Sequence, residues 1–159
     1  MIYLLIGLTL LLALVVTAGY RAYLKRGVEL LTEIHSLVTS EYESLRAHMS
    51  VRSPLGASGS YPILESYGVL AEVKRGGSLR SAYLRLGEKL PLPASLRASL
   101  DGLYGGGSIL FDEEIKRYEM ATLEIGEILA LSRSEAETRV KTVGVLSFAL
   151  ALGIAVYIL

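Results

Sequence analysis

TVGVLSFALALGIAVYIL, residues 142–159, carries no charged side chain and closes the sequence. In a bilayer every backbone polar group has to be satisfied inside the segment, so an apolar run of this length is expected to be a spanning helix. At about 1.5 Å per residue it reaches roughly 27 Å, close to a hydrocarbon core of about 30 Å. A second uncharged run, residues 2–19, lies at the other end. The sequence predicts an all-α chain in which transmembrane helices at residues 1–20 and 142–159 flank a cytosolic helical bundle at residues 21–141.

The charged residues are confined to the central region. All 16 Lys and Arg residues and all 16 Asp and Glu residues lie between Arg21 and Lys141, and their charges cancel. A balanced charge offers no basic surface for nucleic acid. The absence of cysteine excludes disulfides, thiolate zinc sites and a cysteine nucleophile.

Basic residues also set the expected orientation. The first run has no Lys or Arg before it, which favours a retained helix over a signal peptide cleaved after Ala18, although cleavage stays open. The positive-inside rule places the central region in the cytoplasm and both termini outside. The flanking basic residues are Arg21, Lys25 and Arg26 on one side and Arg133, Arg139 and Lys141 on the other.

A heptad pattern opens the central region. Its apolar spacing alternates between four and three residues, which is typical of a helix that packs on other helices. No proline interrupts residues 2–53, so one helix is predicted to run from the membrane to about Met49. The predicted seam consists of Leu24, Val28, Leu31, His35, Val38, Tyr42, Leu45 and Met49, with Leu30, Ile34 and Leu37 widening it.

Three short helices are expected next. Residues 53–60 (SPLGASGS) predict a loop, and Pro62 suits the first turn of a helix that ends at Gly76-Gly77. Ser78 is the expected N-cap of the second short helix. The third is closed by the glycines at 105–107. The expected inner-face residues are Ile63, Tyr67 and Leu70, then Leu79, Ala82, Tyr83, Leu86 and Leu90, then Leu96, Leu100 and Leu103.

A second long helix is predicted from Asp112 to Leu159. Asp112, Glu113 and Glu114 suit its first turn because they oppose the helix dipole. Its expected inner face continues through the residues Ile115, Tyr118, Ile125 and Leu129, with Leu123, Ile128 and Leu131 beside it. The predicted architecture is two long helices with about three short ones packed across them.

No pattern in the sequence indicates catalysis, a metal or a cofactor. The glycine stretches lack the lysine and spacing of a phosphate-binding loop. His35 and His48 lie thirteen residues apart with no carboxylate placed to complete a metal site. Glu113 and Glu114 are neighbours that point about 100° apart on a helix, which favours a solvated acidic turn over a catalytic pair. We therefore expect a non-enzymatic protein without a cofactor.

The two apolar runs contain no charge either, and buried charges are what mark ion pathways. Small residues follow one side of each run and would let helices approach closely, although ordinary membrane composition explains them equally well. These residues are Thr9, Ala13 and Thr17 in the first run and Gly144, Ser147, Ala151 and Ala155 in the second.

Three stretches resemble a known family. A basic turn at residues 21–26 leads into a leucine-rich helix, and residues 77–83 (GSLRSAY) are similar to a Gly-x-Ser-x-x-x-Ala-aromatic element. Residues 139–144 (RVKTVG) are similar to a Lys-containing lead into a final apolar run. With the overall layout, these stretches resemble the stage III sporulation protein AB family of endospore-forming Firmicutes. That family is related to the cytoplasmic domain of the type II secretion platform protein.

The sequence departs from the family pattern in one place. The family usually has Leu-Gly-x-Ser-Asp, with Gln four residues after the Asp. Here Phe111-Asp112 and Lys116 occupy those positions, and the chain has no Gln. The usual Thr-Pro-Leu after the first long helix corresponds to Ser53-Pro54-Leu55.

The resemblance implies an adaptor role. Members act in the transenvelope complex that joins mother cell and forespore, where the cytosolic region docks a secretion-type ATPase, stage III sporulation protein AA. The expected location is the outer forespore membrane, among membrane lipid and the other membrane components of the complex. Self-association and the surface that meets the partner are left open.

Two alternatives remain. The chain could be a platform-like component of a type II secretion or pilus system outside sporulation, which the neighbouring genes would reveal. A small membrane enzyme or transporter subunit would need a polar pair inside the spans or a metal site, and the sequence shows neither.

Overall fold

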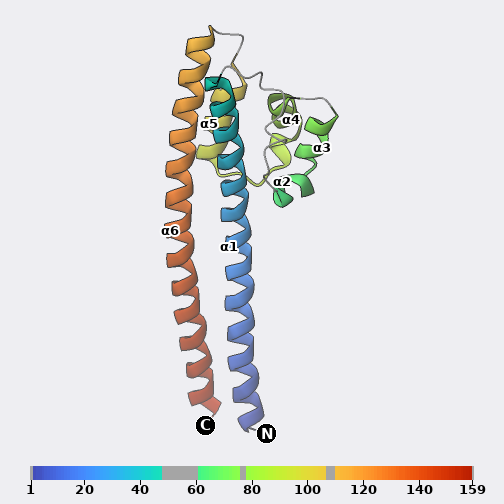
Figure 1. Ribbon diagram of the computed structural model, residues 1–159. Helices are drawn as coiled ribbons and strands as arrows, with labels where there is room; N and C mark the ends of the chain where they lie inside the picture. Colours follow the sequence, from blue (N-terminus) through green and yellow to red (C-terminus); the bar gives the residue numbers. More distant parts are fainter. Residues whose placement is uncertain (1, 48–60, 76–77, 107–109, 159) are drawn as a thin grey trace. The chain divides into compact units, whose positions relative to one another are not determined.

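The computed structural model describes residues 2–47, 61–75, 78–106 and 110–158. Within these four ranges the chain is helical, with turns between the helices and no strand, as the sequence predicts. Two long helices, α1 and α6, stand at the beginning and the end of the chain, and the short helices lie between them in the sequence (Figure 1). The predicted loop at residues 53–60, together with His48 and Met49, lies outside the described residues.

The long helices are uninterrupted. α1 comprises Ile2–Arg46 and α6 comprises Phe111–Ile158. Both were expected from the absence of proline, because apolar periodicity continues where nothing breaks it. Asp112, Glu113 and Glu114 occupy the first turn of α6, where negative charge opposes the helix dipole.

The chain divides into two compact units. One consists of Met1–Val28 and Leu131–Leu159, and the other of Glu29–Ala130. We call them the apolar unit and the central unit. The sequence places the ends of the membrane-spanning segments at residues 20 and 142. The two units are defined by packing instead, so those membrane boundaries stay predictions.

The apolar unit holds segments of α1 and α6 that are long and apolar enough to cross a membrane. Their best 18-residue windows have mean hydropathies of 2.0 and 1.9. In the α1 window none of the residues is buried, and in the α6 window 11% are. A core helix of a soluble protein would be mostly covered, so these segments present apolar surface to their surroundings.

Small residues lie on the covered side of the apolar unit. Ala151 and Ala155 are buried, and a methyl group added at Gly144 would lie 3.6 Å from the Thr17 methyl carbon. The Thr17 hydroxyl donates to the Ala13 carbonyl at 2.8 Å, so its polar group is satisfied within α1. Close approach through small side chains is a common way for helices to pack in lipid.

In the central unit, α2 comprises Pro62–Ser66 and α3 Val69–Lys74. The sequence predicts one helix here, and that expectation is wrong. Gly68 has a φ of 81°, a left-handed conformation that breaks the helix and that glycine adopts at little cost. Gly68 therefore separates two short helices where the pattern of Ile63, Tyr67 and Leu70 predicts one.

The remaining elements follow the local signals more closely. α4 comprises Leu79–Leu86 and continues into the 3-10 turn η2, Gly87–Lys89. The Ser78 side chain accepts the Ser81 amide at 3.1 Å, which confirms the predicted N-cap. α5 comprises Ala94–Tyr104 and ends at Gly105, as expected.

A carboxylate from α1 begins α2. Tyr61 occupies the N-cap position but makes no side-chain hydrogen bond there. Instead the Ile63 amide donates hydrogen bonds of 3.1 Å to both carboxylate oxygens of Glu33. The Leu64 amide donates a hydrogen bond of 2.9 Å to Glu33 Oε2. Amides at a helix start have no partner inside the helix, so Glu33 performs the capping role and ties α2 to α1.

Candidate functional site

The seam of α1 is the first element of the candidate site. Of the predicted seam residues, Leu31, Val38 and Leu45 are buried, Leu24, Val28, His35 and Tyr42 are half-buried, and Met49 lies outside the described residues. Ile34 and Glu41 occupy the buried positions that the heptad reading gave to His35 and Tyr42. At these two turns of α1 the buried residue is therefore the one that precedes the predicted seam residue.

Glu41 is the centre of a polar cluster inside the central unit. Its side chain is only 3% exposed. Its Oε2 accepts a hydrogen bond from the Tyr104 hydroxyl at 2.7 Å and another from the Tyr118 hydroxyl at 3.3 Å. One carboxyl group thus joins α1, α5 and α6, which are distant in sequence.

Burial changes the acidity of this cluster. It raises the pKa of the Glu41 carboxyl from 4.5 to about 7, although the hydrogen bonds from Tyr104 and Tyr118 lower it. Burial also raises the pKa of both phenols, and the Glu41 charge adds to that increase. The two tyrosines therefore remain protonated donors at neutral pH, while Glu41 changes its charge there.

A third tyrosine, Tyr83, joins α4 to α5. The rings of Tyr83 and Tyr104 lie with centroids 5.4 Å apart and planes inclined by 40°. The Tyr83 hydroxyl donates to Asp101 Oδ1 at 2.8 Å. Burial and this hydrogen bond raise the pKa of Tyr83 to about 12. Tyr104 therefore contacts both the Glu41 cluster and the apolar core.

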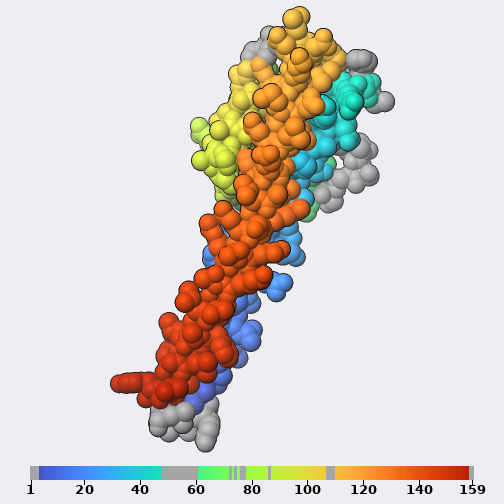
Figure 2. Space-filling view, turned by 90° about the vertical axis from the view of Figure 1, so that its left-hand side faces the viewer, coloured from blue at the N-terminus to red at the C-terminus, as the bar shows by residue number. Residues whose placement is uncertain are grey.

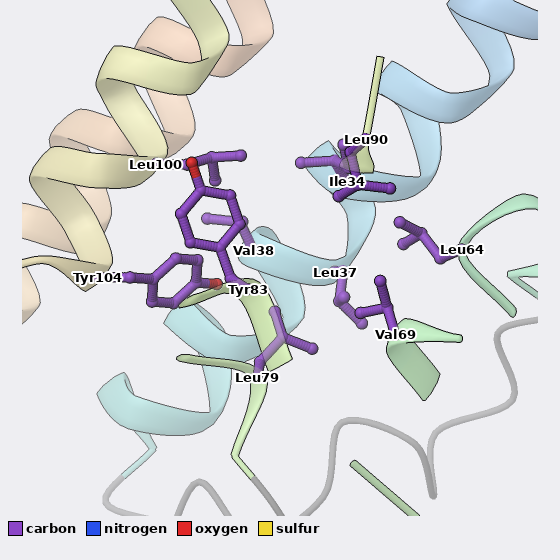
Figure 3. Close-up of a pocket in the computed structure, with 10 residues that line it drawn as sticks. All are labelled: Ile34, Leu37, Val38, Leu64, Val69, Leu79, Tyr83, Leu90, Leu100 and Tyr104. Carbon is purple, nitrogen blue, oxygen red and sulfur yellow. The ribbon is translucent and has the colours of Figure 1, made fainter. Parts of the chain in front are cut away.

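A small apolar cavity of about 30 Å³ lies next to these tyrosines. Figure 3 shows Val38 of α1 beside the Tyr83 ring, whereas Leu37 lies beside Val69 and Ile34 beside Leu90. Binding pockets for small molecules measure about 300–1,000 Å³, so this space is a packing void rather than a ligand site. Its lining comprises Ile34, Leu37, Val38, Leu64, Val69, Leu79, Tyr83, Leu90, Leu100 and Tyr104.

An open groove of about 600 Å³ lies between α5 and α6. Its walls mix charges of both signs with Met120 and Leu103. Ser99 on one wall donates to Glu124 Oε2 on the other at 2.8 Å. The charged lining residues are Glu113, Lys116, Arg117 and Glu124. Its volume falls within the range of ligand pockets, but the groove is open to solvent and does not enclose a small molecule, so it suits contact with a protein surface better.

Two arginines lie against the turn at the end of α5. The Arg80 guanidinium donates to the Gly106 carbonyl. A methyl group built on Gly106 would meet the Arg117 guanidinium, so only glycine leaves room for it without a shift.

The other sequence candidates among the described residues lie in packed or exposed positions. His35 Nε2 lies 3.4 Å from where a Gly126 Cβ would stand, which indicates a histidine packed on α6. Among the residues that the structure describes, no group of three or more His, Asp or Glu side chains could hold a metal ion. Glu113 and Glu114 are exposed in the first turn of α6, as expected for a solvated turn.

Sequence reasoning missed Glu41 because a carboxylate in a helix is read as a surface residue. The sequence did contain one signal for its burial, since residue 41 lies three residues after Val38 and four before Leu45, which puts it on the same side of the helix.

Comparison with known proteins gives no relative: no family model, no curated protein and no solved structure matches the chain.

Proposed function

We propose that the chain is a membrane-anchored, non-enzymatic adaptor that holds a cytosolic secretion-type ATPase at a membrane complex. The observation that carries the proposal is the uncovered apolar surface of the two long helices in the apolar unit. Both helices continue into the central unit, which has a packed core of several helices. Such a chain provides an anchor and a docking body.

Charge supports the orientation. Basic side chains at Arg21, Lys25 and Arg26 follow the first apolar segment, and Arg133, Arg139 and Lys141 precede the second. The ion pair of Arg139 with Glu135 measures 3.1 Å and is exposed. Under the positive-inside rule, the central unit then lies in the cytoplasm as a helical bundle, and both termini lie outside.

The kind of partner follows from the resemblance to the stage III sporulation protein AB family. In that setting the ATPase is of the stage III sporulation protein AA type, and the membrane is the outer forespore membrane. The groove between α5 and α6 and the exposed face of α6 are surfaces in the central unit on which such a partner could dock.

Orientation is tested with single cysteines, since the chain has none of its own. Ser95→Cys is exposed in the central unit, and Tyr157→Cys is exposed near the far end of α6. In intact non-sporulating cells that express the chain in the cell membrane, an impermeant thiol reagent should label Tyr157→Cys and spare Ser95→Cys, and in permeabilised cells it should label both. Labelling of Ser95→Cys in intact cells would contradict a cytoplasmic central unit.

Docking is tested by purifying the tagged full chain from membranes and identifying retained proteins. A secretion-type ATPase should be retained by the native chain. It should be lost with Leu31→Asp, which disrupts the central unit while leaving the apolar segments intact. If no ATPase co-purifies with the native chain from membranes of cells that contain one, the adaptor role is rejected.

A further inference from the structure

The two long helices run side by side in opposite directions within the apolar unit. Figure 1 shows both chain ends at the same end of this unit, and Figure 2 shows the red part of α6 in front of the blue part of α1. A methyl group added at Gly144 would lie 3.6 Å from the Thr17 methyl carbon, so these two residues lie at the same level. This contact fixes which residues of the two helices stand opposite each other.

The first charged side chains beyond the two apolar runs lie at one level. Arg21 is four residues after Thr17, and Lys141 is three residues before Gly144. At a rise of about 1.5 Å per residue, both stand roughly 4.5 to 6 Å from the contact, on the side away from the chain ends. Residues three or four positions from a contact share the face of the helix that makes it. We call Arg21 and Lys141, which are both exposed, the interfacial pair.

The side chains of the interfacial pair are not engaged within the described chain. The apolar unit has six basic side chains and two carboxylates, which gives a net charge of +4. Arg139 forms an exposed ion pair with Glu135 at 3.1 Å, and Lys25 and Arg133 have partners of their own. The pair forms no ion pair or side-chain hydrogen bond with any residue that the structure describes.

The carboxylates lie farther from the apolar runs than the interfacial pair does. Glu137 is one helical turn before Lys141, which places it about 6 Å farther along α6. On α1 no carboxylate precedes Glu29. Tyr23 is 75% exposed two residues after Arg21, and tyrosines are enriched at the level of lipid headgroups. A negative group at the edge of the apolar runs therefore meets the two cations before any carboxylate.

Exposed apolar side chains continue from the interfacial pair toward the chain ends. Leu14 and Phe148 lie seven residues from Arg21 and Lys141 respectively, which is about two helical turns, so each shares a face with its cation. Their side chains are 71% and 57% exposed. Cations at the edge of the bilayer with apolar surface beside them match the two parts of a phospholipid, a charged headgroup and an acyl chain.

We propose that the interfacial pair binds the phosphate of an anionic phospholipid, whose acyl chain lies along Leu14 and Phe148. Guanidinium and ammonium groups are the side chains that bind phosphate in proteins. Basic sites between transmembrane helices on the cytoplasmic side accommodate anionic headgroups. The inference rests on the proposed function only for membrane anchoring and orientation. The bound lipid bridges α1 and α6 where both helices leave the bilayer.

Lipid retention by the full chain tests this site. The chain is purified in a non-ionic detergent and mixed with phosphatidylglycerol or with phosphatidylcholine of the same acyl chains, and bound lipid is measured by native mass spectrometry. Only phosphatidylglycerol should be retained. Arg21→Gln with Lys141→Gln should weaken its retention by about thirtyfold, at about fivefold for each cation. Equal retention of both lipids by the native chain would overturn the proposal.

Arg26→Gln is the matched control variant. It removes the same charge from α1, but at an exposed position five residues beyond Arg21 and about 140° around the helix. Retention of phosphatidylglycerol should change less than twofold in this variant, and Lys141→Arg should keep native retention. If Arg26→Gln weakened retention as much as Arg21→Gln, the attraction would come from net charge, and the site would be rejected.

Inorganic phosphate separates a lipid from a soluble ligand. At the concentration of the lipid it should not displace phosphatidylglycerol, because it lacks the acyl chains that contact the apolar surface. Displacement would make the ligand a soluble phosphate and overturn the lipid assignment. Loss of lipid selectivity in a chain that still retains the ATPase would reject the site and leave the adaptor role standing. Selective retention of phosphatidylglycerol by a chain without any retained ATPase would do the reverse.

Discussion

The hydroxyl of Tyr104 donates a 2.7 Å hydrogen bond to Glu41 Oε2, which joins the end of α5 to the C-terminal part of α1. Tyr118 reaches the same oxygen from α6 at 3.3 Å. A glutamate that is 3% exposed at such a junction makes the packing of three helices depend on one ionisable group. The consequence is a dependence of stability on pH.

Stability should fall as pH rises toward neutrality. Burial raises the pKa of Glu41 from 4.5 to about 7, so the folded chain holds this proton more tightly than the unfolded chain. The contribution is complete below about pH 4.5 and is lost as pH rises to about 7. Its size is about 3 kcal/mol, at 1.36 kcal/mol for each pKa unit.

Glu41→Gln isolates this contribution. The amide oxygen can still accept from Tyr104, but the side chain does not ionise. In detergent, urea unfolding of the full chain should show that the variant gains stability relative to the native chain between pH 5 and pH 8. Glu43→Gln, on an exposed position of α1, should leave that difference at zero. An equal effect of both variants would mean that the pH dependence arises elsewhere.

Removing the phenol donors should have unequal effects. Tyr104→Phe loses the shorter hydrogen bond and should cost about 2 kcal/mol at pH 8, where Glu41 is ionised. Tyr118→Phe loses the longer one and should cost about 1 kcal/mol. Both losses should shrink at pH 5, because a protonated carboxyl needs these donors less. The free energies come from urea unfolding followed by tyrosine fluorescence, and a larger loss at pH 5 than at pH 8 would contradict the assignment.

How far the sequence predicts this structure depends on the reach of each signal. Continuous hydropathy and the absence of proline predicted α1 and α6 within a few residues, and Ser78 and Gly105 were readable because caps are local. Gly68 was missed because a single glycine is compatible with both a helix and a break. Its φ of 81° belongs to the folded chain and is shown by no local residue pattern.

The candidate site was less predictable because its contacts are long-range. Tyr104 and Tyr118 lie 63 and 77 residues from Glu41, and no local pattern pairs them. Glu33 caps a helix that begins about thirty residues later. The outward position of Leu123 depends on which side of α6 receives α1 and α5. Periodicity gives a face of a helix but not what covers it.

Glu33→Ala should loosen α2. The carboxylate accepts two amides at the start of that helix, and the loss of a cap costs about 1 kcal/mol. Hydrogen exchange of the Ile63 and Leu64 amides should accelerate, while amides in α5 keep their native rates. Glu33→Gln retains one accepting oxygen and should lie between the native chain and the alanine variant. Uniform acceleration across the central unit would indicate general unfolding and argue against a local cap.

A carboxylate in the seam should unfold the central unit. Val38 is 1% exposed, and Val38→Asp would bury a charge with no partner, at a cost of several kcal/mol. Circular dichroism should show lost helicity and a lower melting temperature. Ser36→Asp places the same group on an exposed position of α1 and should change neither. Native melting of Val38→Asp would show that this seam is not the core of the unit.

Two glycines near the end of α5 should respond to alanine with opposite signs. Gly102 lies inside the helix with nothing within 4 Å of an added methyl group, so Gly102→Ala should stabilise the chain by about 1 kcal/mol. A methyl group at Gly105 would stand 2.5 Å from the Asp101 carbonyl oxygen, which is backbone and has no other conformation to adopt while the Gly105 amide donates to it. Gly105→Ala should therefore lower stability and disturb the neighbouring Tyr104, which urea unfolding of both variants would measure.

Because Tyr104 supports Glu41, Gly105→Ala should also shift the pH at which stability falls, whereas Gly102→Ala should leave it unchanged. The same sign for both substitutions would show that the turn after α5 is not fixed as described.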